Sequence, residues 1–325
     1  MSSQTVYAGI DIGGTNIKYG LVDQRGKVLF REQRPTMADK GADPLMHMIA
    51  NLSESLLYHA AEEDFEVKWL GVGTPGAVDW KSGQVIGVSP NIAGWQGMDI
   101  GQILRDRLNM PVFVDNDVNA MALAEARFGA ALGYKSVVCV AVGTGVGGAI
   151  LFDGRLWRGA NHAAGEIGHV TINPGGPKCR CGSNGCIEVY CNSTAIIART
   201  NAKLSKGLTP AFEEVLDGSL SNMSIKKLFA AARKNDDIAL GVIQETAEYL
   251  AIGIANVVNF LNPEIVVLGG GVAEGGGGFV EVVAAEVRKR ALRPAAENVR
   301  ITRATLGNDA GFIGAGILGD ARPLE

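Results

Sequence analysis

Apolar runs separated by glycine turns are the main pattern in this chain. Residues 6–22 form two β-rich apolar segments on either side of Gly13-Gly14, which predicts a strand, a tight turn and a second strand. Residues 137–155 repeat the pattern 130 positions later around Gly143-Thr144-Gly145. The aligned copies pair Ile12 with Val142, Leu21 with Leu151, Asp23 with Asp153 and Arg25 with Arg155. Two related hairpins predict two similar lobes with a ligand between them.

Helical spacing of apolar residues marks much of the remaining chain. It predicts helices over residues 43–59, 100–108, 193–201, 225–232 and 239–260. Short apolar runs predict strands at 112–114, 265–268 and 299–305, with helices ending at Phe128, following Gly278 and covering 309–318. This mixture of strands and helices predicts an α/β fold.

The composition is that of an ordinary globular protein. Apolar residues make up 47% of the 325 positions and charged residues 20%, so we expect a large core and little disorder. The formal net charge of −4 gives no general attraction to nucleic acid. The best apolar candidate for a membrane span, residues 250–268, is interrupted by polar residues, and residues 1–5 carry no signal-peptide pattern. We expect a cytoplasmic protein with neither a nucleic-acid nor a membrane partner.

Three of the five cysteines, Cys179, Cys181 and Cys186, lie within eight residues, and His169 precedes the first by ten. Three thiolates and one imidazole are a ligand set that a structural zinc site takes. Glycines between Cys181 and Cys186 allow the tight turns that bring the ligands together. A disulfide between Cys179 and Cys181 is not expected, because one intervening residue closes a strained ring. The alternative to a zinc site is a mobile loop with reduced, buried thiols.

Two glutamates bracket this cysteine loop. Glu166 lies three residues before the histidine, and Glu188 lies two residues after the last cysteine. A bound zinc ion fixes both ends of the loop, and two rigid carboxylates suit hydrogen bonds from the neighbouring hydroxyls of a sugar. The alternative is a pair of solvated loop charges.

Acidic residues also stand where two strands end. Asp11 ends the first strand beside the turn amides and the Thr15 hydroxyl, an arrangement that suits phosphate oxygens and a hydrated magnesium ion. An ordinary hairpin with a capping Asp is the alternative. Asp117 follows the strand at 112–114, where it serves either as a helix cap or as the acceptor of a proton from an attacking hydroxyl. The sequence favours neither interpretation.

Two loops carry weaker signals. Asn91 and Trp95 lie in a turn-rich segment, where they offer an amide and an apolar face to a sugar or serve only as surface and packing residues. Gly269-Gly270-Gly271 follows a buried strand and suits a flat nucleotide base against bare backbone. The run Gly275–Gly278 predicts a flexible connection.

Together these motifs resemble the ROK family of bacterial sugar kinases over nearly the whole chain. The resemblance rests on several motifs in the family's order: Asp11-Ile12-Gly13-Gly14-Thr15, Gly73-Thr74-Pro75-Gly76, Asn116-Asp117, Gly143 to Gly148, Gly165 to His169, Cys179 to Glu188, and Leu268 to Gly271. The sequence departs from the family at Cys191-Asn192, beside the expected sugar pocket.

The resemblance implies a two-lobed, actin-like (ribonuclease H-like) ATPase fold with a structural zinc loop. It implies a smaller lobe of residues 1–116, joined by the C-terminal helix 309–325, and a larger lobe of residues 117–308 that carries the zinc loop. The residues implied for ATP and Mg²⁺ are Asp11, Gly13, Gly14, Thr15, Lys18, Gly143, Thr144, Gly145, Gly270 and Gly271. Those implied for the sugar are Gly76, Asn91, Asn116, Asp117, Glu166, His169 and Glu188. Asp117 is the implied catalytic base, and the implied zinc ligands are His169, Cys179, Cys181 and Cys186.

The implied activity is ATP-dependent phosphorylation of the C6 hydroxyl of glucose. Other substrates stay open, namely N-acetylmannosamine, N-acetylglucosamine, mannose and fructose, as does polyphosphate in place of ATP. The family also contains sugar-responsive repressors with an N-terminal helix-turn-helix domain. Because the first glycine hairpin begins at Val6, we expect no such domain in this chain. The family's habit implies a homodimer or homotetramer.

Overall fold

The computed structural model describes residues 4–87, 89, 91–276 and 278–321, and it divides into two compact units. Unit 1 comprises Met1–Val137, Ala149–Gly165 and Thr305–Glu325, and unit 2 comprises Val138–Gly148 and Glu166–Ala304. The division differs from the predicted boundary between residues 116 and 117. Helix α3 (Asp117–Phe128) belongs to unit 1, because it packs against the C-terminal helix α12 (Ala310–Gly316).

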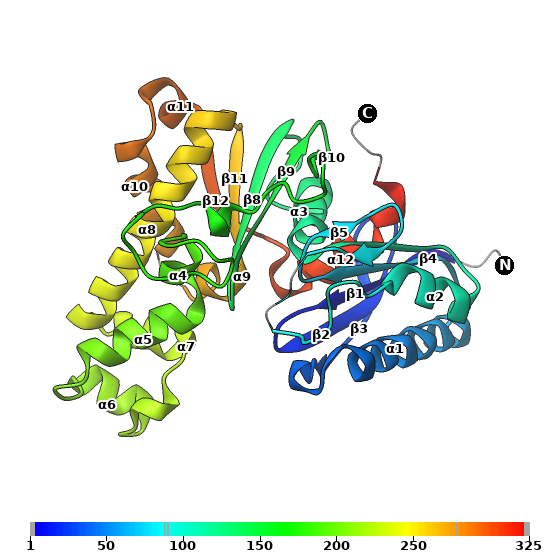
Figure 1. The fold of residues 1–325 in the computed structure, drawn as a ribbon, viewed down its shortest axis with the longest axis horizontal. Helices are drawn as coiled ribbons and strands as arrows, with labels where there is room; N and C mark the ends of the chain where they lie inside the picture. Colours follow the sequence, from blue (N-terminus) through cyan, green and yellow to red (C-terminus); the bar gives the residue numbers. More distant parts are fainter. Residues whose placement is uncertain (1–3, 88, 90, 277, 322–325) are drawn as a thin grey trace. The chain divides into compact units, whose positions relative to one another are not determined.

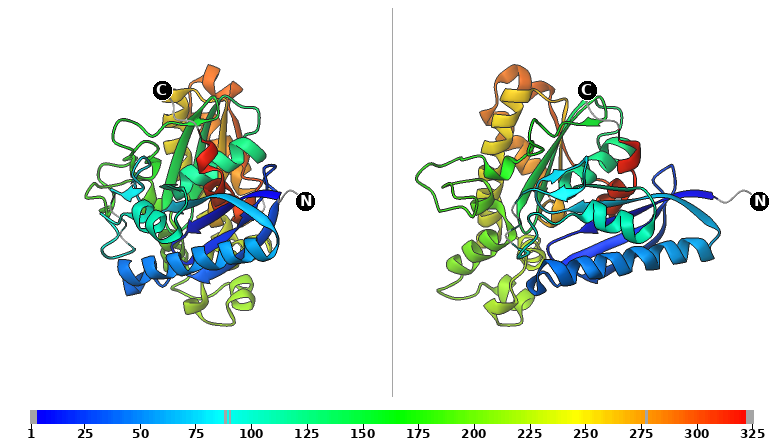
Figure 2. Two further views of the ribbon diagram at one scale, coloured as in Figure 1. Left: turned by 90° about the vertical axis from the view of Figure 1, so that its right-hand side faces the viewer. Right: turned by 45° about the vertical axis from the view of Figure 1, so that its right-hand side comes forward.

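Unit 1 is built on a five-stranded sheet with the order β3-β2-β1-β4-β7. Its strands are β1 (Gln4–Ile12), β2 (Asn16–Val22), β3 (Val28–Pro35), β4 (Phe65–Thr74) and β7 (Val112–Asn116). Helices α1 (Ala42–Glu62) and α2 (Ile100–Leu108) cover one face (Figures 1 and 2), where Leu45, Ile49 and Leu104 are buried against the strands. Helices α3 and α12 pack on the other face, and a short hairpin forms from β5 (Val78–Asp79) and β6 (Gln84–Val85).

A second five-stranded sheet has the order β10-β9-β8-β11-β12. Its strands are β8 (Ser136–Val142), β9 (Val146–Phe152), β10 (Arg155–Leu156), β11 (Ile265–Gly269) and β12 (Arg300–Arg303). In chain order both sheets follow the pattern 3-2-1-4-5. Strand β9 begins 130 residues after β2, the offset between the two glycine hairpins. The structure therefore confirms the predicted duplication.

The helices of unit 2 gather around its longest one, α8 (Asp237–Leu261), which packs along α10 (Phe279–Arg290) (Figure 1). The others are α4 (Glu188–Cys191), α5 (Ser193–Lys203), α6 (Pro210–Leu216), α7 (Ile225–Ala232), α9 (Gly270–Ala273) and α11 (Arg293–Asn298). Among the described residues, α8 alone is long and apolar enough to cross a membrane. A soluble core helix has the same properties, and α8 buries Val242, Leu250 and Ile254 inside unit 2.

The predicted helices are confirmed with small shifts at their ends. Both α2 and α7 have the predicted bounds, whereas α8 begins two residues earlier than expected. Helices α4, α6, α9 and α11 were missed, since each has seven residues or fewer and shows too little periodicity to detect. The predicted glycine turn after β11 instead begins α9 at Gly270.

The C-terminal end of α3 is held by a buried carboxylate. Glu125 is fully buried and accepts backbone hydrogen bonds from Ala130 (2.7 Å), Thr305 (2.9 Å) and Leu306 (2.8 Å). Hydrogen bonds from several backbone amides stabilise an ionised carboxylate away from water. This anchor fixes the helix whose first residue is Asp117.

Candidate active site and metal centre

Asp11 lies near the end of β1, paired in register with Lys18 of β2 and Gly73 of β4. Burial raises the pKa of Asp11 to about 6, while the charge of Lys18 opposes the shift. The Lys18 ammonium donates to the carbonyl (3.0 Å) and side-chain oxygens (3.1 Å) of Asn308. A buried carboxylate with a raised pKa is stabilised by a cation, so Asp11 fits the expected role at magnesium.

An Asp11→Asn substitution tests this environment. A folded pKa of about 6, against the ordinary value of 3.8 for an aspartate carboxyl, means that the folded protein binds the proton more tightly than the unfolded chain. Ionisation of Asp11 therefore destabilises the fold as the pH rises from about 4 to 6. Without magnesium and nucleotide, we expect the variant to be more stable than the wild type at pH 8, by up to about 3 kcal/mol.

Urea unfolding at pH 4, 5, 6 and 8 measures the effect. The stability difference should shrink as the pH falls through this window, because the wild-type carboxyl then becomes neutral. A variant that is less stable than the wild type at pH 8 would contradict the expectation.

Thr36 anchors the turn after β1 through two hydrogen bonds. The Thr36 hydroxyl donates to the Gly13 carbonyl (2.7 Å), and its amide donates to the Thr15 carbonyl (2.9 Å). The Gly13 amide closes the hairpin by donating to Asn16 (3.0 Å), so it is already engaged, whereas Gly14 and Thr15 are exposed. The Gly143 amide closes the second hairpin in the same way, onto Gly145 (2.9 Å). The exposed residues of the turns are therefore the better candidates for phosphate contacts.

The cap of α3 is Asn116. Its side-chain oxygen accepts from the amides of Val118 (2.9 Å) and Asn119 (3.2 Å), and its amide group donates to the Gly76 carbonyl (3.2 Å). The structure thus brings together Asn116 and Gly76, two residues predicted for the sugar. Asp117 is the first residue of the helix, so the N-cap position belongs to Asn116 and not to Asp117.

Asp117 lies beside Asp11 at the end of β4. A Cβ atom placed on Gly73 would lie 3.4 Å from the Asp117 Cα and 3.7 Å from Asp11 Oδ1. One Asp117 oxygen accepts from the Val118 amide (2.9 Å). The predicted metal-binding carboxylate and the predicted catalytic base are therefore neighbours in unit 1.

The loop with Asn91 and Trp95 differs from expectation. Trp95 is fully buried and its indole N–H donates to Thr74 Oγ1 (2.9 Å), so the hypothesis that it offers a face to a sugar was wrong. Asn91 lies in an exposed turn, next to the Ile92 amide that donates to Ser89 (3.2 Å). Pro90 of the same loop lies outside the described residues.

The four predicted zinc ligands converge in unit 2. The donor atoms of His169, Cys179, Cys181 and Cys186 all lie within 4.8 Å of one another. Cys181 Sγ is 3.7 Å from Cys186 Sγ, and His169 Nδ1 is 3.7 Å from Cys179 Sγ. Burial beside the other thiols raises the pKa of Cys186 to about 12, and a zinc ion would reverse this shift by binding the thiolates. This donor set fits a closed, structural zinc site.

The backbone of the loop requires a glycine before Cys186. Gly185 has φ of +62°, and a Cβ atom there would lie 1.6 Å from the Asn173 carbonyl oxygen. The Cys179 amide donates to Ser183 (2.7 Å) and closes the turn around the first two cysteines. The predicted dependence of this loop on glycine is confirmed.

Glu166 lies on the other side of the histidine. His169 Nε2 is 4.0 Å from Glu166 Oε2, whereas Nδ1 faces Cys179. Burial raises the pKa of Glu166, His169 lowers it, and the charge of Glu188 raises it further. The two predicted sugar-binding glutamates are therefore close enough to interact electrostatically.

Glu188 also joins the zinc loop to the second glycine hairpin, a contact that the sequence did not reveal. Its Oε2 accepts from the Val146 amide (3.0 Å), and a Cβ atom on Gly145 would lie 2.7 Å from this oxygen. The amide and hydroxyl of Ser193 both donate to the Gly143 carbonyl (2.8 Å each). At the departure from the family pattern, Asn192 caps α5 by accepting from Ala195 (2.7 Å).

The glycines after β11 divide into packed and open positions. A Cβ atom on Gly270 would lie 2.5 Å from the Val142 carbonyl oxygen, whereas one on Gly271 meets nothing within 4 Å. Gly275 packs against the Phe229 ring, so this part of the predicted flexible run is a packed segment, and Gly277 lies outside the described residues.

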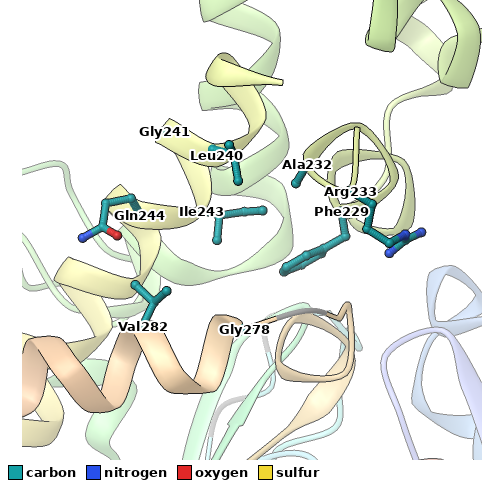
Figure 3. Close-up of a pocket in the computed structure, with 9 residues that line it drawn as sticks. All are labelled: Phe229, Ala232, Arg233, Leu240, Gly241, Ile243, Gln244, Gly278 and Val282. Carbon is teal, nitrogen blue, oxygen red and sulfur yellow. The ribbon is translucent and has the colours of Figure 1, made fainter. Parts of the chain in front are cut away.

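A cavity of about 430 Å³ lies between α7, α8 and the start of α10. Figure 3 shows the Phe229 ring and the Ile243 side chain extending into it, with Gly278 at its edge. No local pattern in the sequence indicates this cavity, because its lining comes from three helices that are separated along the chain.

Two sheets with one strand order, each opening on a glycine hairpin, define an actin-like ATPase fold. A family model described as "ROK family" matches residues 7–322, and the chain belongs to the ROK family.

The relatives include enzymes and regulators. A glucokinase of Halalkalibacterium halodurans is 36% identical, over 96% of this chain and 94% of its own length. The structure of a ROK family glucokinase from Streptomyces griseus, in complex with glucose and AMPPNP, has a TM-score of 0.85 at 32% identity and covers 96% of this chain and 98% of its own. A xylose repressor of Caldicellulosiruptor bescii is 29% identical, over 94% of this chain and 76% of the repressor.

Proposed function

We propose that this protein is an ATP-dependent hexokinase that phosphorylates the C6 hydroxyl of glucose. The observation that carries the proposal is the placement of Asp117 at the head of α3, beside Asp11, with the capping role taken by Asn116. The similarity to a glucokinase in complex with glucose and AMPPNP supports both substrates. As a cytoplasmic sugar kinase it would act as a homodimer or homotetramer.

The proposed reaction is an in-line displacement. The C6 oxygen of the sugar forms a bond to the γ-phosphorus, the bond from that phosphorus to the bridging oxygen breaks, and ADP leaves. Asp117 accepts the hydroxyl proton. Because phosphoryl transfer passes through a loose transition state, positioning of the hydroxyl and neutralisation of charge contribute more than proton removal.

The remaining predicted residues bind the two substrates. For the sugar we propose Gly76, Asn91, Asn116, Asp117, Glu166, His169 and Glu188. For ATP we propose Asp11, Gly13, Gly14, Thr15, Lys18, Gly143, Thr144, Gly145, Gly270 and Gly271. Magnesium would supply charge neutralisation at the phosphates, and Asp11 would hold it. Zinc would hold the cysteine loop and orient His169.

The apolar cavity beside Gly278 is our candidate for the adenosine end of ATP. It lies next to the segment that follows Gly270 and Gly271, and its lining combines the Phe229 ring with the polar groups of Arg233 and Gln244. Such a mostly apolar cavity with a few polar groups is typical of sites for flat ligands.

A coupled assay that combines several hexoses with ATP, ADP and polyphosphate tests the proposal. We expect the highest kcat/KM for glucose with ATP, ahead of mannose, fructose, N-acetylmannosamine and N-acetylglucosamine. A higher value for another sugar would redefine the substrate, and a higher value with polyphosphate would redefine the donor. Sugar binding in calorimetry without transfer from any donor would instead support a sugar-responsive regulator, the function named for the repressor relative.

A further inference from the structure

A buried ion pair lies directly beneath the turn that carries Asp117. Asp115 is 2% exposed and Arg158 is 8% exposed. Arg158 donates to Asp115 Oδ2 from Nε (2.8 Å), and its Nη2 lies 2.6 Å from the same oxygen. Both residues belong to unit 1, although they are 43 positions apart in the chain.

The other oxygen of Asp115 organises the turn itself. Oδ1 accepts from the Asn116 amide (2.8 Å) and from the Asn119 side chain (2.8 Å). Asn116 in turn caps α3 through Val118 and Asn119. Arg158 is thus linked through one carboxylate to the residues on both sides of Asp117.

Arg158 is fixed on its other sides as well. Its guanidinium lies over the Trp80 ring, 4.8 Å from the ring centroid, and its carbonyl accepts from the Ala164 amide (3.0 Å). Within the same loop, His162 Nε2 is 3.5 Å from Asp79 Oδ1. A planar guanidinium that stacks and donates two N–H groups is held in one orientation, which a lysine ammonium does not reproduce.

The burial of this pair calls for a role beyond stability. A buried ion pair is weak evidence for stabilisation, because desolvation offsets much of the attraction and apolar residues of similar volume often do as well. Asp115 accepts hydrogen bonds from a backbone amide and a side chain of one turn. A small displacement of a reacting group on that turn would lower the reaction rate strongly. Orientation of that turn is the function that the contacts support.

We propose that Arg158 is a positioning residue for phosphoryl transfer, acting through Asp115 to hold the Asn116–Asp117 turn in a single conformation. The inference rests on the proposed kinase function, but Arg158 and Asp115 themselves touch neither the sugar nor ATP in that proposal.

Kinetics and stability of three variants separate positioning from a structural role. In Arg158→Gln we expect kcat to fall about 10- to 100-fold, with the KM values for sugar and ATP changed less than threefold. This variant also loses thermal stability, since it leaves the Asp115 charge buried without its partner. The double variant Arg158→Gln/Asp115→Asn removes that charge, so its Tm should return toward the wild-type value while kcat stays low. Arg158→Lys keeps the positive charge but loses the paired N–H donors and the stacking on Trp80, so its kcat should fall between those of the wild type and Arg158→Gln.

The matched control is Arg105→Gln. Arg105 is a half-buried arginine of the same unit, and it donates to the backbone carbonyls of Ser82 (2.8 Å) and Val112 (3.3 Å). The kcat of Arg105→Gln should stay within about threefold of the wild type, because the Arg105 side chain does not hydrogen-bond to the Asp115 carboxylate. If kcat and Tm recover together in the double variant, the pair is only structural and the proposal is overturned.

Hydrogen exchange of the native protein provides a readout that does not depend on kinase activity. Peptides covering residues 112–121 should exchange at least tenfold faster in the double variant than in the wild type, even with Tm restored. If the wild type transfers no phosphate while this exchange difference is present, the proposed kinase function fails, and only the holding of the Asn116–Asp117 turn by Arg158 through Asp115 stands. If the wild type is an active kinase and neither kcat nor exchange changes in the variants, the positioning role fails alone.

Discussion

Replacing Asp117 by Asn should lower kcat for sugar phosphorylation about 10³-fold while leaving sugar binding measurable. The substitution preserves the shape of the side chain at the first position of α3 but removes the group that accepts the hydroxyl proton. General-base catalysis contributes typically 10²- to 10⁴-fold, which sets the expected magnitude. The fold should be unaffected, because the cap of α3 is Asn116.

Steady-state kinetics give kcat, and isothermal calorimetry with glucose gives the dissociation constant of the variant. Asp106→Asn is the matched control, since Asp106 is an exposed carboxylate of α2 whose contact is the Gln102 side chain (2.8 Å). Its turnover should equal that of the wild type. Turnover of Asp117→Asn within about tenfold of the wild type would refute the assigned role, because so small a loss is below the range of general-base catalysis.

The features that the sequence predicted correctly depend on residues close together in the chain. The glycine hairpins lie between adjacent strands, so their alternating patterns and turns are visible in one window. The four predicted metal ligands lie between His169 and Cys186, and the structure brings their donor atoms together as expected. Short-range spacing and donor type were sufficient for both.

The features that the sequence missed depend on backbone geometry and on distant partners. Asn116 and Asp117 are adjacent acceptors at a strand end, and the extended backbone of Asn116 (φ −61°, ψ 146°) decides which of them caps the helix. Trp95 lies in a polar, turn-rich loop, yet its indole is buried by the surrounding core. No local pattern indicates that Arg158 meets Asp115, or that Glu188 meets Val146, because each contact requires the completed fold.

Cys181→Ser should reduce bound zinc from one ion per chain to none and raise the KM for glucose about tenfold or more. Cys181 is the exposed cysteine of the cluster, so its replacement removes one ligand without opening a cavity in the core. A three-ligand remnant binds zinc more weakly, and loss of the ion frees the backbone between His169 and Cys186. Glu166 and Glu188 flank that segment, and changes around a metal centre commonly alter affinity or activity 10- to 100-fold.

Metal analysis by mass spectrometry, calorimetry with glucose, and kinetics measure the three consequences. Cys139→Ala is the control, because Cys139 is a buried thiol of β8 outside the loop, and its zinc content should equal that of the wild type. Treatment of the wild type with a strong chelator should reproduce the rise in KM, and added zinc should reverse it in the wild type but not in Cys181→Ser. Unchanged sugar affinity in metal-free protein would separate the loop from the sugar site, since a disordered loop cannot hold Glu166 and Glu188 in the positions on which binding is proposed to depend.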